Sequence, residues 1–177
     1  EAFNNTSIES ITIPSKVIDL KEGWCKGADE LRIVKVKQAS QQYCCFEEGI
    51  IIGKETVDSS DYVNLVFCDR NIKSITILDS IKRFYSYSFY RTSITNIKIP
   101  KEVRTIGKCA FGFCNQLRKI EFINESKIET IEDEAFIGTS ISSIIIPNKV
   151  RIIGKNTFSN CRRLRLIEFS KESELET

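Results

Sequence analysis

Seven cysteines and a few carboxylate runs are the side chains of this 177-residue chain that could take part in catalysis or metal binding. Histidine is absent, which excludes Ser-His-Asp and Cys-His catalysis and every metal site that needs an imidazole ligand. No Cys-x-x-Cys pair occurs, so a zinc site is not expected. The acidic run Glu132–Glu134 has no second carboxylate placed across a cleft and is typical of a solvated surface. We therefore predict neither an enzyme nor a metal site.

The segment Gly49–Lys54 (GIIIGK) superficially resembles a phosphate-binding loop. Such a loop needs four residues between its glycines and a Ser or Thr after the lysine, because backbone amides surround the phosphate and a hydroxyl binds Mg²⁺. Here three bulky isoleucines separate the glycines, and Glu55 follows the lysine. Nucleotide binding is therefore not expected, and no cofactor is predicted.

Charge and hydropathy narrow the class of protein further. Lys and Arg number 26 against 24 Asp and Glu, and this net charge of +2 favours neither nucleic acid nor an anionic membrane as a partner. The apolar runs are only a few residues long, far short of the roughly 20 that cross a bilayer. Because methionine is absent, residue 1 is not expected to be a translation start, and we expect a folded piece of a longer protein.

A repeat organises most of the sequence. The segment Val103–Phe122 (VRTIGKCAFGFCNQLRKIEF) recurs as Val150–Phe169 (VRIIGKNTFSNCRRLRLIEF), an offset of 47 residues (150 − 103). Between them lies a shorter variant, Ile128–Pro147, and Ile81–Pro100 is of the same kind. Units of two kinds therefore alternate. The first kind ends in Cys-x-x-Leu-x-x-Ile-x-Phe, and the second ends in Thr-Ser-Ile-x-x-Ile-x-Ile-Pro.

Each unit contains two apolar residues, two positions apart, which mark a short strand with one buried face. These pairs stand at 11/13, 34/36, 75/77, 97/99, 120/122, 144/146 and 167/169, in steps of 23, 41, 22, 23, 24 and 23 residues. The apolar residues from Ala110 to Leu117 follow helical spacing, which predicts a brief helical turn opposite the strand. Since no coil can bury its apolar side alone, we expect stacked coils with Phe111, Phe136 and Phe158 in one column.

The combined pattern resembles the BspA-like (treponemal-type) leucine-rich repeat family over residues 1–36 and 71–177. It departs from the family pattern at Phe84-Tyr85, where Ile-Gly is expected. The expected fold class is β-rich α/β: a leucine-rich-repeat solenoid with one parallel sheet and short helical turns, interrupted by a β-hairpin insertion. The resemblance implies a cell-surface or secreted protein of bacteria or parasitic protists, of the kind that adheres to host matrix proteins and host cells.

One continuous solenoid domain is expected. It divides into repeats over 1–36 with a truncated first unit, a non-repeat insertion over 37–70, and repeats over 71–177 with a truncated last unit. Within the insertion, apolar stretches at 49–53 and 62–68 flank a polar tip, which predicts a β-hairpin with a long loop. This hairpin either covers part of the core or contacts a partner.

The cysteines allow one disulfide at most to be considered. Cys114 and Cys161 stand two coils apart, about 10 Å, which is too far for a bridge that needs Cα atoms within about 7 Å. A bridge from Cys44 or Cys45 to Cys68, which would join the two sides of the hairpin, stays open as an alternative.

The outward side chains of the strands form the extended face with which solenoids bind partners. Ile145 and Leu166 are apolar on adjacent strands of this face and could form a patch. The predicted binding residues are Lys35, Asn96, Lys98, Lys119, Glu121, Ile145, Leu166 and Glu168. A mildly basic rim on the helical side is expected to be only solvated; it contains Lys108, Arg118, Arg162, Arg163 and Arg165.

We therefore expect a non-enzymatic protein–protein interaction module of a cell-surface or secreted protein. Its expected partner is another protein, a host matrix or cell-surface protein, with no nucleic acid and no membrane insertion. The alternative is an intracellular structural or scaffold repeat protein, located in the cytoplasm, with no host-facing role. Self-association through the truncated ends is also expected, because a cut coil exposes apolar surface.

Overall fold

The apolar pairs of the repeat form strands at every position except Ile75/Ile77, which is extended without regular strand pairing. The computed structural model describes residues 2–47 and 49–175, and these contain no helix. The strands are β1 (Ser10–Ile13), β2 (Ile33–Val36), β3 (Tyr43–Glu47), β4 (Ile50–Lys54), β5 (Tyr62–Cys68), β6 (Arg83–Phe84), β7 (Asn96–Ile99), β8 (Thr105–Ile106), β9 (Lys119–Phe122), β10 (Thr130–Ile131), β11 (Ser143–Ile146), β12 (Ile152–Ile153) and β13 (Leu166–Phe169).

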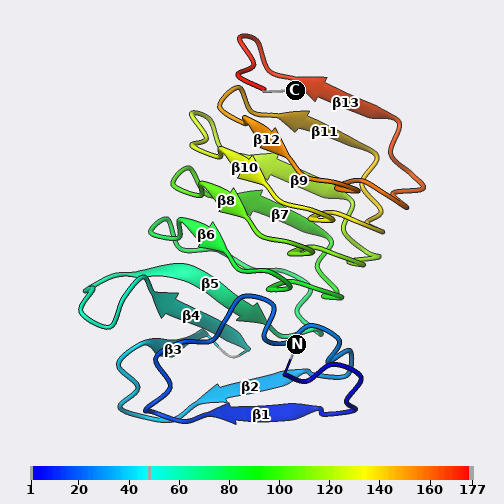
Figure 1. The fold of residues 1–177 in the computed structure, drawn as a ribbon. Helices are drawn as coiled ribbons and strands as arrows, with labels where there is room; N and C mark the ends of the chain where they lie inside the picture. Colours follow the sequence, from blue (N-terminus) through cyan, green and yellow to red (C-terminus); the bar gives the residue numbers. More distant parts are fainter. Residues whose placement is uncertain (1, 48, 176–177) are drawn as a thin grey trace.

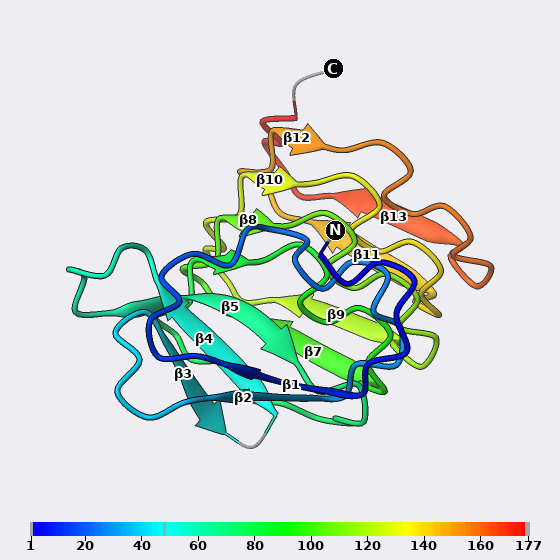
Figure 2. The same ribbon diagram turned by 60° about the horizontal axis from the view of Figure 1, so that its bottom comes forward.

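The strands lie on two sides of a stacked solenoid of about seven turns (Figures 1 and 2). On one side, neighbouring coils pair in parallel as β1–β2, β7–β9 and β11–β13. On the other side, β12, β10, β8 and β6 pair in parallel and continue through β5, β4 and β3 as one seven-stranded sheet, the back sheet. The prediction of a single parallel sheet is therefore wrong. The second apolar pair of each unit, such as Val103/Ile106, also takes extended backbone, and its strand pairs with the neighbouring coils.

The predicted short helical turns are also wrong, because these segments are series of tight turns. The N–H groups of Cys109, Phe111 and Phe113 donate to carbonyl oxygens of the next coil at 2.7–3.1 Å, and those of Ala110 and Gly112 donate to carbonyls three residues back. Cys109 and Phe113 have φ angles of 51° and 56°, which a right-handed helix does not contain. The apolar spacing that looked helical therefore reflects turns that stack coil on coil.

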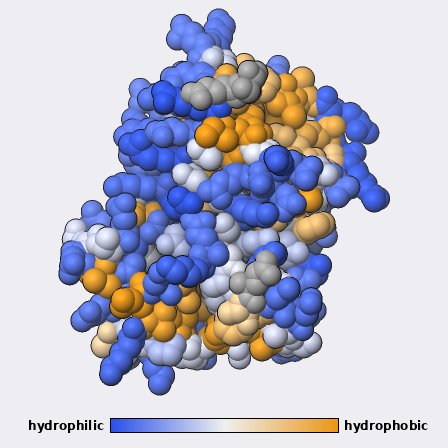
Figure 3. Space-filling model, in the orientation of Figure 1, coloured by the Kyte–Doolittle hydropathy of each residue, from blue (hydrophilic) through white to orange (hydrophobic). Residues whose placement is uncertain are grey.

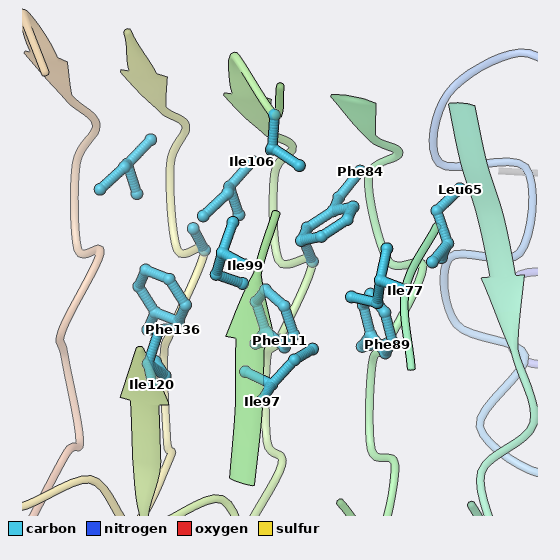
Figure 4. Close-up of a cluster of buried hydrophobic side chains, with 14 of the residues drawn as sticks. Leu65, Ile77, Phe84, Phe89, Ile97, Ile99, Ile106, Phe111, Ile120 and Phe136 are labelled. Atoms are coloured by element: carbon cyan, nitrogen blue, oxygen red, sulfur yellow. The ribbon is translucent and has the colours of Figure 1, made fainter. Parts of the chain in front are cut away.

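A column of phenylalanine rings runs through the core along the stack (Figure 4). The ring centroids are 4.8 Å apart for Phe89–Phe111, 5.3 Å for Phe111–Phe136 and 5.8 Å for Phe136–Phe158, and each pair is stacked face to face. Phe89, Phe111 and Phe136 are completely buried, whereas Phe158 is half-buried. The predicted column of Phe111, Phe136 and Phe158 is confirmed.

The insertion is a three-stranded antiparallel meander that extends the back sheet. The predicted hairpin is present, because β4 pairs with β5 in antiparallel register. A further strand, β3, pairs with the other edge of β4 and has no repeat signal in the sequence. Since β5 pairs in parallel with β6, the insertion joins the solenoid edge to edge. Its apolar side chains pack on the first coils, where the rings of Phe67 and Trp24 lie 6.1 Å apart.

β13 is the last strand of the described residues, and its side chains are largely exposed. Ile167 and Phe169 are 38% and 49% exposed, whereas their partners on β11, Ile144 and Ile146, are 2% and 0% exposed. Each coil covers the apolar side chains of the coil before it. No described residue covers β13, so its inward-facing side chains remain accessible.

Candidate binding face

The outward side chains of β7, β9, β11 and β13 form one face of the solenoid, which we call the sheet face. Along β7 and β11 exposed and buried residues alternate strictly, so Asn96 and Lys98 point outward while Ile97 and Ile99 enter the core. The structure brings seven of the predicted binding residues together on this face: Asn96, Lys98, Lys119, Glu121, Ile145, Leu166 and Glu168.

Lys35 is the predicted binding residue that lies apart from the others. It belongs to β2, whose sheet contains β1 alone, and β2 packs against β3 and β4 of the insertion. Lys35 is exposed, as predicted for an outward position. The insertion therefore separates the first pair of strands from the sheet face.

The sheet face contains a groove where β9 and β11 run side by side without pairing. β7–β9 and β11–β13 are hydrogen-bonded sheets, but no strand pairing joins β9 to β11. The groove has a volume of about 920 Å³, and its lining includes Ile120, Glu121, Ile123, Ser143 and Ile145. Strand pairing on this face occurs at each step of 23 residues and is absent at the step of 24 (144 − 120).

A second hollow adjoins the first over β7 and residues 73–79, with a volume of about 610 Å³. The two hollows share Lys98, Lys119, Glu121 and Ile123 in their linings, so they form one trough across the strands. Lys119 forms an ion pair with Glu121, and Lys98 Nζ lies 4.0 Å from the same carboxylate. The hydrogen bond from Lys119 lowers the pKa of Glu121, which favours its charged form at neutral pH.

Apolar side chains lie next to these charges. Ile145 is 57% exposed and Leu166 is 49% exposed, and their strands are paired neighbours. Figure 3 shows this apolar area in the upper part of the face, over β11 and β13, beside hydrophilic residues. Ile123, 42% exposed and part of both hollows, was not predicted, because it follows the strand and lies outside the repeat positions. The unequal step sizes are the signal that could have located the groove.

The described part of the chain offers no site for metal or thiol chemistry. No group of His, Cys, Asp or Glu in it could hold a metal ion. Burial raises the pKa of the Cys114 thiol to about 11, and burial followed by the hydrogen bond to Glu134 raises that of Cys109 to about 12. These thiols therefore stay protonated and unreactive at neutral pH. No helix of the described residues is both long and apolar enough to cross a membrane.

The cysteines of the described residues are free. The alternative bridge from Cys44 or Cys45 to Cys68 is wrong, because β4 lies between β3 and β5, and strands two apart are about 10 Å from each other. Cys114 and Cys161 have a packing role instead. The Cys114 thiol donates to the Phe89 carbonyl at 2.9 Å and lies 3.3 Å from the Thr92 hydroxyl, and Cys161 repeats this arrangement.

Comparison with protein families identifies one match. A family model described as a BspA type leucine rich repeat region (6 copies) matches residues 1–48 and 63–165. The match leaves out 49–62, which includes β4 and the loop that follows it. No curated protein is similar enough to the chain to count as a match.

Several solved structures share the fold. The pneumococcal vaccine antigen PcpA is similar over 97% of this chain and 42% of its own, with 24% identity and a TM-score of 0.85. A leucine rich cell surface protein from Faecalibacterium prausnitzii is similar over 99% of this chain and 53% of its own, with 23% identity and a TM-score of 0.69. A leucine-rich repeat protein from Eubacterium ventriosum has 24% identity over 93% of this chain and 37% of its own, with a TM-score of 0.63. The chain thus spans about half or less of these relatives.

Proposed function

The chain belongs to the BspA-type leucine-rich repeat family, and on this premise we propose that it is a non-enzymatic interaction module that binds another protein through its sheet face. The trough across β7–β11 beside exposed Ile145 and Leu166 is the observation that supports this most. An apolar centre with a charged margin is the usual anatomy of a protein interface. An extended strand-lined surface is also the one that repeat proteins generally use for binding.

The finer proposal is a cell-surface or secreted location with a host matrix or host-cell protein as partner. Two structures of similar fold are described as a vaccine antigen and a cell surface protein, which supports exposure of this chain outside the cell. The alternative is an intracellular scaffold repeat protein. Antibody staining of intact source cells separates the two proposals: labelling without permeabilisation supports the surface location, and labelling only after permeabilisation supports the scaffold.

The sheet-face proposal predicts the behaviour of one combined variant. Replacing Lys98, Lys119, Glu121, Ile145 and Leu166 together by alanine is expected to weaken partner binding about tenfold or more, because residues at the centre of an interface carry most of its binding energy. Surface plasmon resonance against a panel of purified extracellular matrix proteins and host-cell receptors measures the effect. The far-UV circular dichroism spectrum is expected to stay unchanged, because none of these side chains is buried.

A matched control removes the same residue types elsewhere. Alanine at Ile18, Lys37, Glu55, Lys82 and Ile152 deletes two lysines, one glutamate and two large aliphatic side chains, all of them exposed and outside the sheet face. Binding by this variant is expected to equal that of the parent protein. If the sheet-face variant bound as tightly as the control, the partner would not use this face.

We also propose that the exposed inward side of β13 supports self-association. Sedimentation velocity is expected to show dimers whose fraction rises with concentration, because Ile167 and Phe169 are accessible apolar side chains at an unpaired strand. The double change Ile167→Lys and Phe169→Lys is expected to give a monomer. Ile145→Lys, on the outward face of the neighbouring strand, is expected to leave the dimer intact. A parent protein that stays monomeric at high concentration contradicts the proposal.

A further inference from the structure

Four arginines gather at the corner where the chain enters β9 and β13, at the right edge of Figure 1. Arg118 and Arg165 each immediately precede a strand and occupy the same repeat position, 47 residues apart (165 − 118). The N–H of Arg118 donates to Thr95 in the coil before, and the N–H of Arg165 donates to Ser142 in the same way. The two side chains therefore stand two coils apart, about 10 Å along the stack.

Arg162 and Arg163 complete the group, which we call the basic corner. They lie between Cys161, which is buried, and Leu164, which is half-buried, so the backbone of this turn directs both arginines outward. All four arginines are exposed. Between Arg118 and Arg165 the corner carries the hydroxyls of the serines at 140 and 142, with neither a carboxylate nor an aromatic ring at those positions.

The basic corner differs from the other cationic positions of the solenoid because its charges are not balanced by the protein. Elsewhere ion pairs join successive coils: Arg104–Glu129 at 2.8 Å and Lys127–Glu102 at 2.7 Å are examples. Lys108, the remaining residue of the basic rim identified in the sequence, lies 3.9 Å from Glu134. No carboxylate of the described residues forms an ion pair with an arginine of the corner, and only Arg165 makes a side-chain hydrogen bond, to the Arg162 carbonyl at 3.3 Å.

We propose that the basic corner binds a linear sulfated polysaccharide. A guanidinium group binds a sulfate through two parallel hydrogen bonds, which suits arginine better than lysine to this ligand. A row of such groups spaced along the stack fits a chain with repeated anionic groups better than one isolated anion. The corner offers no ring on which a nucleic acid base could stack. It also lacks the apolar centre that a protein partner requires, which the trough supplies instead.

The test uses heparin as the probe, measured by elution from a heparin column and by titration calorimetry at several salt concentrations. The variant Arg118→Ala, Arg162→Ala, Arg163→Ala and Arg165→Ala is expected to lose retention at physiological salt. The slope of log K against log salt is expected to fall by roughly 2–4, since each lost contact releases fewer counterions. Unchanged thermal unfolding is the check that the variant folds.

A matched variant with alanine at Lys16, Lys37, Lys82 and Lys149 changes the net charge equally, from +2 to −2 (2 − 4), at exposed positions away from the corner. It is expected to bind heparin as the parent protein does. Equal loss of retention in both variants would mean that net charge alone drives binding, and this result overturns the proposal. Equal binding of desulfated heparin, polyglutamate or phosphatidylserine vesicles overturns the assignment to a sulfated chain.

Discussion

Replacing Phe111 by alanine is expected to lower the free energy of unfolding by about 3–5 kcal/mol, the range typical of a buried phenylalanine. The ring is completely buried between those of Phe89 and Phe136, with its edge contact to Phe84 at 5.8 Å between centroids. Removing it leaves a cavity in the middle of the column. Because the surrounding coils are fixed by hydrogen bonds to each other, they cannot close that space.

Urea unfolding followed by circular dichroism measures the change. Phe158→Ala serves as the comparison, because this ring is half-buried and stacks on one neighbour only among the described residues. Its effect is expected to be about half as large or less, in proportion to the smaller apolar area that it buries. A nearly neutral Phe111→Ala variant would contradict the stacked column as the source of stability.

Gly107→Ala is expected to cost about 2–3 kcal/mol, near the upper end of what overpacking usually costs. A Cβ atom at this position would lie 2.6 Å from the N atom of Ser86 and 2.7 Å from the carbonyl oxygen of Phe84. Both are backbone atoms of the preceding coil, so they can give way only if the coils separate. Such separation weakens the hydrogen bond from the Gly107 N–H to the Phe84 carbonyl, which is 2.9 Å long.

Gly112→Ala is the control for the loss of glycine itself. Its added Cβ would meet the Tyr90 ring at 3.1 Å and the Ile137 side chain at 3.3 Å, and both can rotate away, although the Cys109 carbonyl at 3.2 Å cannot. The melting temperature of Gly112→Ala is expected to lie close to that of the parent protein, and that of Gly107→Ala clearly below it. Equal melting temperatures would show that Gly107 is not needed for the close approach of the coils.

The sequence predicts the parts of the fold that depend on which residues must be buried. The apolar pairs recur because each coil presents the same inner face, and Phe111, Phe136 and Phe158 recur because rings of one shape stack well on each other. The same reasoning places the outward residues correctly on the strands, so seven of the eight predicted binding residues share one face. Alternation along a strand is a local property and can be read from neighbouring residues.

Backbone conformation and pairing between coils are less visible in the sequence. Residues 110–117 have the apolar spacing of a helix, but Cys109 and Phe113 adopt positive φ, which non-glycine residue types seldom reveal. Strand β3 was not predicted, because its residues YCCFE carry no clear alternation. The trough depends on which neighbouring strands pair, and that depends on the fit between whole coils.

The missing pairing between β9 and β11 has a mechanical consequence. Within each coil pair, β7–β9 or β11–β13, strands are hydrogen-bonded on both sides of the stack, whereas between the pairs only the back sheet is continuous. Bending stiffness is therefore lowest at this junction, and the back sheet acts as the hinge. An array built in this way adjusts its curvature once in every two coils, so the width of the trough can adapt to partners of different size.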